Sequence, residues 1–274
     1  MHELERRRWM TISVVLPTLG KRKAELSRLF NSLANQTISN FEVVIVSQAN
    51  HEIVSELLDQ VSFSYQHIRI DTLGLSHARN IGMSYIKNNI VTFSDDDCWY
   101  HSEAFNEVLS YYETNDSAIV CYQIYDPKTQ EYYKTYLDYY QQQIRRRDLF
   151  RKSSIEFFID VSRVDRDLVV FDEDFGLGAK YPSGEENLFL FKMYQQGHKI
   201  SYVPKVIVYH AKPPIESRLT YQSFVSKGPL FKRMYNTPIA LTLLTGLFFK
   251  KMRHLEKPFL YYKDAVRELF YSRR

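Results

Sequence analysis

The chain has 274 residues, of which 45% are hydrophobic and 25% are charged. This balance is typical of folded domains with an ordinary core and argues against a disordered chain. The length allows one large domain with an appendage, or two modest domains. The net charge of +4 is unevenly spread, because residues 212–274 hold 13 Lys and Arg against 4 Asp and Glu, a net of +9. The remainder is therefore acidic, and we expect the basic region to meet an anionic surface.

Cysteine usage and hydropathy bear on location. Cys98 and Cys121 form neither a disulfide framework nor a zinc pattern, which favours a reducing cytoplasm. Residues 1–8 are highly charged and lack the apolar stretch of a signal peptide. The longest nearly apolar run, residues 239–249, is shorter than the roughly 20 residues that span a bilayer.

Apolar runs and helix-like segments alternate along the first half of the chain. Helices are predicted over 23–35 and 51–60, from Ser76 as N-cap to about 87, and from 102 onward. This alternation predicts a mainly parallel sheet with helices on both faces. The strands are predicted at 11–16, 41–46, 89–93 and 118–124, with a weaker one at 68–70.

The second half is less regular. Residues 125–151 are rich in Tyr and Arg, and a loop plus an amphipathic helix is predicted there, as an insertion near the substrate site. Basic, aromatic helices are expected after Pro213 and Pro214, so we place a domain boundary at 211–212. Between these segments we predict a strand at 155–161, a Gly-containing loop at 175–182, a helix at 184–196, and short strands at 199–203 and 206–210.

Three consecutive carboxylates, Asp95, Asp96 and Asp97, follow the predicted strand 89–93. That places them at the carboxyl edge of the sheet, where open α/β sheets bind ligands. Three adjacent acids repel one another unless a cation or hydrogen bonds neutralise them. Mg²⁺ and Mn²⁺ prefer carboxylate oxygens and often bridge to substrate phosphates. A solvated acidic turn is the alternative for the run taken alone.

Several segments, in order, resemble those of family 2 glycosyltransferases. The similarity covers about 11–211, and the order of the motifs is more specific than any one of them. The segments are Ser13-Val-Val-Leu-Pro-Thr18, Ser32-Leu-Ala-Asn-Gln-Thr37 with Phe41-Glu-Val-Val-Ile-Val46, Gly74-Leu-Ser-His-Ala-Arg-Asn-Ile-Gly82, Phe93-Ser-Asp-Asp-Asp-Cys98, Pro182-Ser-Gly-Glu-Glu-Asn187 and Val208-Tyr-His210.

The resemblance implies a GT-A fold, with a nucleotide-sugar half at about 10–100 and an acceptor half at about 101–211, followed by a helical extension at 212–274. It also implies inversion of the anomeric centre in a single displacement. A cation, Mn²⁺ or Mg²⁺, would hold the developing charge of the diphosphate leaving group. By this resemblance Asp97 and His210 would bind the metal, Asp95 would approach the ribose, and Asp96 would help to orient them.

Inversion requires a general base for the acceptor hydroxyl. Glu185 and Glu186 open a predicted helix, where the helix dipole also favours negative charge, so a purely structural role is the alternative. By the resemblance Glu186 is the base and Glu185 binds the acceptor. The family usually has Asp at the second position, and with the longer side chain of Glu186 either residue could reach the hydroxyl.

The donor site is expected to include Pro17 and Thr18, at the end of the first strand, and Arg79. Many relatives place an Asp after the second strand to bind uracil, but here the segment is Ser47-Gln48-Ala49-Asn50. Gln48 could read a base edge instead. A UDP-sugar is the expected donor, and a dTDP-sugar stays open.

The C-terminal region combines apolar and basic residues. Lys227 and Arg233 precede the run 239–249, and Lys250 and Arg253 follow it. Such a pattern is typical of helices that lie in a membrane interface. The alternatives are packing on the catalytic domain or on a second copy of the chain, as a homo-oligomer. No nucleic-acid motif accompanies the basic residues.

The sequence therefore predicts a metal-dependent inverting hexosyltransferase, located at the cytoplasmic face of the plasma membrane. Its acceptor would be a glycan or lipid-linked oligosaccharide of capsule, exopolysaccharide or O-antigen synthesis. One alternative is a sugar-1-phosphate nucleotidylyltransferase, although Pro17–Lys23 has a single Gly where that class needs a Gly-rich loop. The other alternative is a non-catalytic scaffold that binds glycans or membranes.

Overall fold

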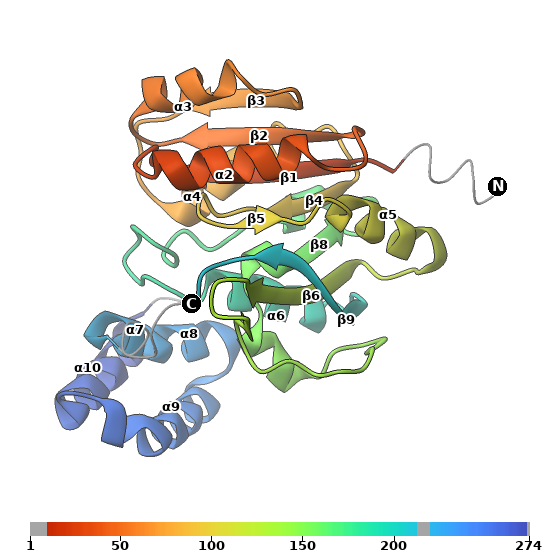
Figure 1. The fold of residues 1–274 in the computed structure, drawn as a ribbon. Helices are drawn as coiled ribbons and strands as arrows, with labels where there is room; N and C mark the ends of the chain where they lie inside the picture. The colour runs from red at the N-terminus through yellow and green to blue at the C-terminus, as the bar shows by residue number, and fades with distance from the viewer. Residues whose placement is uncertain (1–9, 213–219, 273–274) are drawn as a thin grey trace. The chain divides into compact units, whose positions relative to one another are not determined.

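The computed structural model describes residues 10–212 and 220–272. Their contacts form two compact units, both drawn in Figure 1. We call them the sheet unit (10–73, 77–170 and 193–212) and the helical unit (74–76, 171–192 and 220–272). The expected domain boundary at 211–212, and the division of 10–211 into two halves, stay predictions.

A mixed sheet, nine-stranded over the described residues, lies at the centre of the sheet unit. The strand order is β3-β2-β1-β4-β8-β6-β9-β5, and β7 pairs with β6 off this path. β1 to β4 are parallel, as are β6 and β9, whereas β8 is antiparallel to β4 and β6. The strands are β1 Ile12–Thr18, β2 Phe41–Ser47, β3 Ser64–Arg69, β4 Ile90–Phe93, β5 Trp99–Tyr100, β6 Ile119–Asp126, β7 Glu131–Tyr132, β8 Phe157–Asp160 and β9 Ile200–Tyr209.

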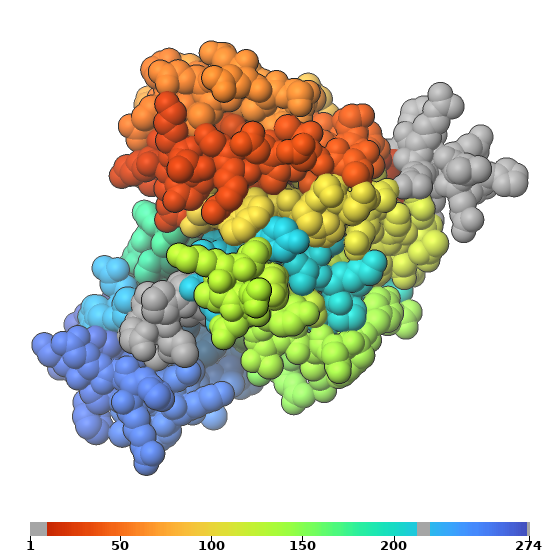
Figure 2. Space-filling view, in the orientation of Figure 1, coloured from red at the N-terminus to blue at the C-terminus, as the bar shows by residue number. Residues whose placement is uncertain are grey.

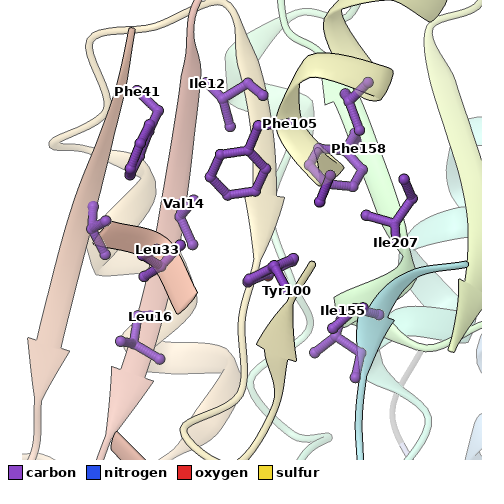
Figure 3. Packing of buried hydrophobic residues seen from close by; sticks show 14 of the residues in the cluster. Ile12, Val14, Leu16, Leu33, Phe41, Tyr100, Phe105, Ile155, Phe158 and Ile207 are labelled. Atoms are coloured by element: carbon purple, nitrogen blue, oxygen red, sulfur yellow. The ribbon is translucent and has the colours of Figure 1, made fainter. Parts of the chain in front are cut away.

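Helices cover both faces of the sheet, as predicted. Alternate residues of β1, such as Ile12 and Val14, face a core shared with α2, α3 and α5. Figure 3 shows Phe41, Phe105 and Phe158 in this core. The helices are α2 Lys23–Ala34, α3 His51–Leu58, α4 Leu75–Met83 and α5 Ala104–Thr114.

α4 covers the other face, which carries Val15. It approaches β1 and β2 at Gly82, where an added Cβ would lie 2.5 Å from Val15 Cγ1 and 3.2 Å from Val46 Cγ2. A glycine is therefore needed at this contact between helix and sheet. The helix begins at Leu75, so Ser76 lies in its first turn and not at the predicted N-cap.

Residues 125–151 differ from the prediction, because this segment, all of it described, holds no amphipathic α-helix. It turns from β6 into β7 and ends in the 3₁₀ helix Arg146–Arg151. Two side chains of the segment bind the buried carboxylate of Glu156: Lys134 Nζ donates to Oε1 at 2.9 Å, and Tyr136 OH donates to Oε2 at 2.5 Å. The segment is exposed on the face drawn in Figure 2. The bonds to Glu156 tie the part of the segment before the 3₁₀ helix to the body of the unit.

The strands near the end of the sheet unit also differ from the prediction. The two short strands expected at 199–203 and 206–210 are one strand, β9. Pro204 lies within it, where the pairing with β6 shifts register between Cys121 and Gln123. A register shift accommodates a proline that cannot donate to the sheet ladder. Further 3₁₀ helices lie at Ser154–Glu156 and Arg166–Leu168.

The helical unit contains the first part of α6 and a cluster of C-terminal helices. In this cluster α8 packs against both α9 and α10. Among the described residues, none of the helices combines the length and apolar character needed to cross a membrane. The elements are α6 Glu185–Gln195, α7 Tyr221–Val225, α8 Lys227–Met234, α9 Thr237–Lys251, the 3₁₀ helix Met252–His254 and α10 Pro258–Tyr271.

Candidate active site

The three adjacent aspartates follow β4 at the carboxyl edge of the parallel strands, as the sequence predicts. A tight turn forms there, in which the backbone N–H of Cys98 donates to the Asp95 carbonyl at 3.3 Å. The buried Cys98 thiol donates to the same carbonyl at 3.2 Å, and burial raises the pKa of this thiol to about 12. The turn is therefore closed on itself, and the three carboxylates have different neighbours.

Asp97 pairs with His210, which follows the end of β9. His210 Nε2 lies 3.1 Å from Asp97 Oδ1, and both side chains are largely buried. Burial alone would raise the pKa of Asp97, but the hydrogen bond and charge of His210, with Arg22, hold it below the usual value. Burial would likewise lower the pKa of His210, but Asp97 raises it. The structure thus brings together the two side chains that the resemblance makes metal ligands.

A hydrogen bond fixes the orientation of the His210 ring. Nδ1 donates to the carbonyl of Ala211 at 2.6 Å, which leaves Nε2 directed at Asp97. The ring of Tyr133 packs edge-on at 5.1 Å between ring centres. Such support of the second ring nitrogen is the usual way in which a ligating histidine is oriented.

Asp96 lies beside the end of β1. Its Oδ2 accepts from Thr18 Oγ1 at 2.8 Å, and its Oδ1 lies 3.4 Å from Arg22 Nη1. Burial raises the pKa of Asp96, although Thr18 and Arg22 oppose the shift. Asp96 and Thr18 were both predicted for the donor site, and they are in direct contact.

Asp95 is held by Arg79 of α4. Arg79 is 1% exposed, and its Nη2 donates to Asp95 Oδ1 at 3.0 Å and to Ser154 Oγ at 2.7 Å. Its guanidinium also lies 5.9 Å from the centre of the Phe93 ring. The buried Arg79 therefore connects the aspartate turn to α4 and to Ser154.

Gln48 and Pro17 lie at the adjoining ends of β2 and β1. The backbone N–H of Gln48 donates to the Thr18 carbonyl at 2.9 Å, and Pro17 pairs with Val46 in the sheet. In the place of the acidic residue that many relatives have, the Ser47 hydroxyl lies 2.6 Å from His51 Nδ1 and 2.8 Å from His67 Nε2. At the position after β2 this end of the sheet thus presents a hydroxyl and two imidazoles instead of a carboxylate.

Sequence reasoning missed two arginines of α2 and the loop before it. Arg22 forms ion pairs with Asp96 and Asp97, and Arg28 Nη2 donates to the Asp97 carbonyl at 2.8 Å. The Arg28 guanidinium also stacks 3.8 Å from the centre of the Trp99 ring. The basic run Lys21-Arg-Lys23 directly after the first strand was the available signal.

Glu185 and Glu186 belong to the helical unit, where they are the first two residues of α6. Glu185 is buried, and a Cβ added at Gly176 would lie 3.4 Å from its carboxyl carbon. Ser76 donates to the Phe175 carbonyl at 2.6 Å, which ties the loop before α6 to the start of α4. The helix dipole at this position stabilises both carboxylates.

Metal-binding geometry is limited to a pair of side chains. Among the described residues, no group of three or more His, Cys, Asp and Glu side chains could hold a metal ion together. Asp97 and His210 supply one oxygen and one nitrogen donor at 3.1 Å from each other. A metal held here would need its other ligands from a substrate or from water.

Comparison with known proteins agrees with the motifs. Residues 13–169 match the family described as glycosyl transferase family 2. An uncharacterized glycosyltransferase of Haemophilus influenzae is 38% identical over 106 residues, which are 38% of this chain and 35% of that protein. A poly(ribitol-phosphate) beta-N-acetylglucosaminyltransferase, TarS of Staphylococcus aureus, is 21% identical over 208 residues, which are 74% of this chain and 35% of TarS. The chain thus spans about a third of the length of these two relatives.

A solved structure shares the fold. The crystal structure of S. aureus TarS 1–349 in complex with UDP-GlcNAc is similar with a TM-score of 0.66 and 17% identity, over 90% of this chain and 74% of that one. The likeness confirms the expected α/β architecture of the GT-A type, with its curled, mostly parallel sheet.

Proposed function

Because the chain belongs to glycosyl transferase family 2, we propose that it is a metal-dependent, inverting glycosyltransferase that uses a UDP-sugar. The acceptor would be a glycan or a lipid-linked oligosaccharide in surface polysaccharide synthesis. The observation that carries the proposal is the meeting of Asp97 and His210 at the carboxyl edge of the sheet, beside Asp96 and Thr18. UDP-GlcNAc is the first donor to test, because a structural neighbour is solved in complex with it.

The proposed metal ligands fit Mn²⁺ or Mg²⁺. A carboxylate oxygen suits both ions, and an imidazole nitrogen suits Mn²⁺ better. His210 is held with Nδ1 bonded to Ala211, so Nε2 is the nitrogen available to a metal. When bound, the ion would neutralise charge that develops on the leaving diphosphate. Arg22 contacts the second oxygen of Asp97 and would add positive charge on the same side.

The rest of the donor would be held by the residues around the aspartate turn. Asp95, fixed by Arg79, would accept a hydrogen bond from the ribose, and Asp96 would keep Thr18 in place. Pro17 and Gln48, at the ends of β1 and β2, would contact the nucleobase of the donor. The uncharged Ser47 in this region removes the carboxylate that other family members offer to uracil, so a dTDP-sugar stays a second donor to test.

Glu186 is the proposed base, with Glu185 as the acceptor-binding acid. A base at this step takes the proton of the acceptor hydroxyl as that oxygen attacks the anomeric carbon. Both carboxylates lie in the first turn of α6, where the helix dipole is favourable to negative charge. Because the two residues are adjacent, the reverse assignment, with Glu185 as the base, is the alternative.

The base assignment has a direct test. Glu186→Gln should reduce transfer at least a hundredfold, because the amide cannot accept the hydroxyl proton, while UDP-GlcNAc binding stays within about twofold of the wild type. Release of UDP in the presence of Mn²⁺ and calorimetric titration with UDP-GlcNAc are the two measurements. Glu185→Gln is the matched variant. Full activity of Glu186→Gln would remove it from the role of base.

We further propose that the C-terminal helices contact an anionic membrane surface. Phe249 and Phe259 are 67% and 72% exposed, and both rings pack against that of Phe248, so they form one apolar patch. Lys250, Arg253 and Lys257 are exposed within the same segment. Apolar side chains bordered by cations are the pattern of interfacial helices. Such contact would keep the enzyme near a lipid-linked acceptor, on the cytoplasmic side of the membrane.

A further inference from the structure

The helical unit places a lysine of the C-terminal region beside the two glutamates that begin α6. Lys227 is the first residue of α8, and its Nζ donates to Ser183 Oγ at 3.4 Å. Burial lowers the pKa of Lys227, and the charges of Glu186 and Glu185 oppose this shift. Lys227 therefore faces the acidic pair, although its position in a basic stretch had predicted a contact with a membrane.

Close packing fixes Lys227 in this place. Leu230, one helical turn after Lys227, meets Gly184, where an added Cβ would lie 2.8 Å from Leu230 Cδ1. Gly184 has a φ of +111°, a conformation that favours glycine directly before the acidic pair. On another side α8 meets α10, and a Cβ at Gly228 would lie 2.0 Å from the Ala265 carbonyl oxygen. These contacts on two sides hold the backbone of α8 at Lys227 beside the start of α6.

The other charged side chains around α8 have partners of their own. Arg233 forms ion pairs with Asp172 at 3.4 Å and with Asp174 at 2.5 Å. On α10, Glu268 accepts from Tyr181 OH at 3.0 Å and lies 3.6 Å from Lys180 Nζ. Asp264 accepts from Tyr221 OH at 2.8 Å and lies 3.4 Å from Arg267. Among the described residues of α8, Lys227 is thus the cation for which contacts near the start of α6 are seen, through Ser183.

We propose that Lys227 is a positioning residue for the Glu185–Glu186 pair, and that its ammonium, held beside Ser183, offsets the repulsion between the two neighbouring carboxylates and keeps them in place. Neighbouring carboxylates repel each other, and a cation placed near both relieves that repulsion. A base must be ionised before the acceptor hydroxyl arrives. The C-terminal helices would thus complete the machinery of transfer. This inference rests on the proposed function, because it takes one glutamate of the pair as the base.

The test compares three single variants of the full chain. Lys227→Met keeps most of the side-chain volume and removes the charge, Lys227→Arg keeps the charge, and Lys232→Met removes a cation elsewhere on α8, where it donates to Thr237. UDP release from UDP-GlcNAc with Mn²⁺ gives the turnover, with water as acceptor. Calorimetry gives the donor Kd, and thermal unfolding gives Tm. If UDP-GlcNAc does not bind, the dTDP- or GDP-sugar that raises Tm most replaces it.

Lys227→Met should lose tenfold to a hundredfold in turnover, on the order expected for weakening a general base, with the donor Kd within about twofold. Lys227→Arg should recover most of the loss, and Lys232→Met should match the wild type. In a Glu185→Gln background, Lys227→Met should cost much less, because a single carboxylate needs less compensation. Non-additivity of this kind is a result that a merely structural lysine would not give.

Two results would overturn the role of Lys227. One is wild-type turnover in Lys227→Met. The other is an equal loss in Lys227→Met, Lys227→Arg and Lys232→Met with a matching fall in Tm, which would make the side chain structural. Failure of the proposed function looks different: wild-type turnover in both Glu185→Gln and Glu186→Gln would remove the base itself. If Glu186→Gln loses turnover and Lys227→Met keeps it, the proposed base stands and only the positioning role of Lys227 is disproved.

Discussion

Each of the three adjacent aspartates has a different cationic or hydroxyl partner, which is how the sheet unit tolerates them side by side. Asp95 pairs with Arg79, Asp96 accepts from Thr18, and Asp97 pairs with His210. Arg22 bridges the last two. Without such partners, three neighbouring carboxylates would raise one another's pKa and destabilise the turn. The resulting arrangement fixes three carboxylates in three directions around one edge of the sheet.

Arg79 offers a test of this arrangement by stability. Arg79→Met should lower the free energy of unfolding by about 2 kcal/mol, because it removes charge-assisted hydrogen bonds to Asp95 and Ser154 from a buried position. Arg69→Met is the matched control, since Arg69 forms an exposed ion pair with Glu52 that should be worth less than about 1 kcal/mol. Urea denaturation measures both. Equal, small losses would contradict a structural role for Arg79.

Sequence reasoning reached some site residues and not others, for a physical reason. Asp97 and His210 came from motifs whose order implied that they would meet, and their 3.1 Å pairing agrees with that expectation. The ion pairs of Arg22 join residues about 75 positions apart in the sequence, and no local sequence pattern predicts such pairs. The position of Lys227 near Glu185 and Glu186 could not be foreseen either, because charge composition does not reveal the neighbours of a helix. The long-range partners of charged residues can be identified only once the fold is known.

Elements with strong local signals were the predictable part of the fold. β1, β2 and β4 are buried throughout and appear in the sequence as continuous apolar runs. β3 is partly exposed and polar, so the predicted strand at 68–70 captured only the end of Ser64–Arg69. The amphipathic helix predicted within 125–151, beside a loop, is absent: Lys134 and Tyr136 bind Glu156, and only the 3₁₀ helix Arg146–Arg151 forms there.

Gly82 is the element-scale test of how α4 packs on the sheet. Gly82→Ala should destabilise the protein by about 1–3 kcal/mol, because the new Cβ would meet Val15 Cγ1 at 2.5 Å. Gly246→Ala is the matched control within α9, where a Cβ meets nothing within 4 Å and should stabilise by about 0.5–1 kcal/mol. In both thermal and urea unfolding, the midpoint should therefore fall for Gly82→Ala and rise for Gly246→Ala. A stabilising Gly82→Ala would show that α4 does not pack this closely.

At the scale of the whole molecule, the basic C-terminal region divides into two kinds of surface. Lys227 and Arg233 face their own unit, the first toward Glu185 and Glu186 and the second toward Asp172 and Asp174. The exposed cations around the Phe249–Phe259 patch are Lys250, Arg253 and Lys257. A net charge of +9 thus serves both internal pairing and, in our proposal, attraction to an anionic surface.

Membrane contact predicts binding that depends on lipid charge and on two aromatic rings. The chain should sediment with vesicles containing a quarter phosphatidylglycerol and far less with pure phosphatidylcholine, and salt should weaken the binding. Phe249→Ser with Phe259→Ser should reduce binding at least tenfold, because both exposed rings are lost. Val170→Ser, an exposed apolar residue of the sheet unit, is the control. Equal binding by all three proteins would contradict this surface.

In the proposed function Asp97 and His210 hold a divalent ion that binds the diphosphate of a UDP-sugar. Calorimetric titration with UDP-GlcNAc, in Mn²⁺ and in EDTA, tests it most directly on the wild type and Asp97→Ala, with the exposed Asp59→Ala as control. The wild type and Asp59→Ala should bind at least tenfold more tightly with Mn²⁺, a difference of about 1.4 kcal/mol or more. Asp97→Ala should bind equally weakly with and without the ion. A full Mn²⁺ effect in Asp97→Ala would show that Asp97 does not bind the ion.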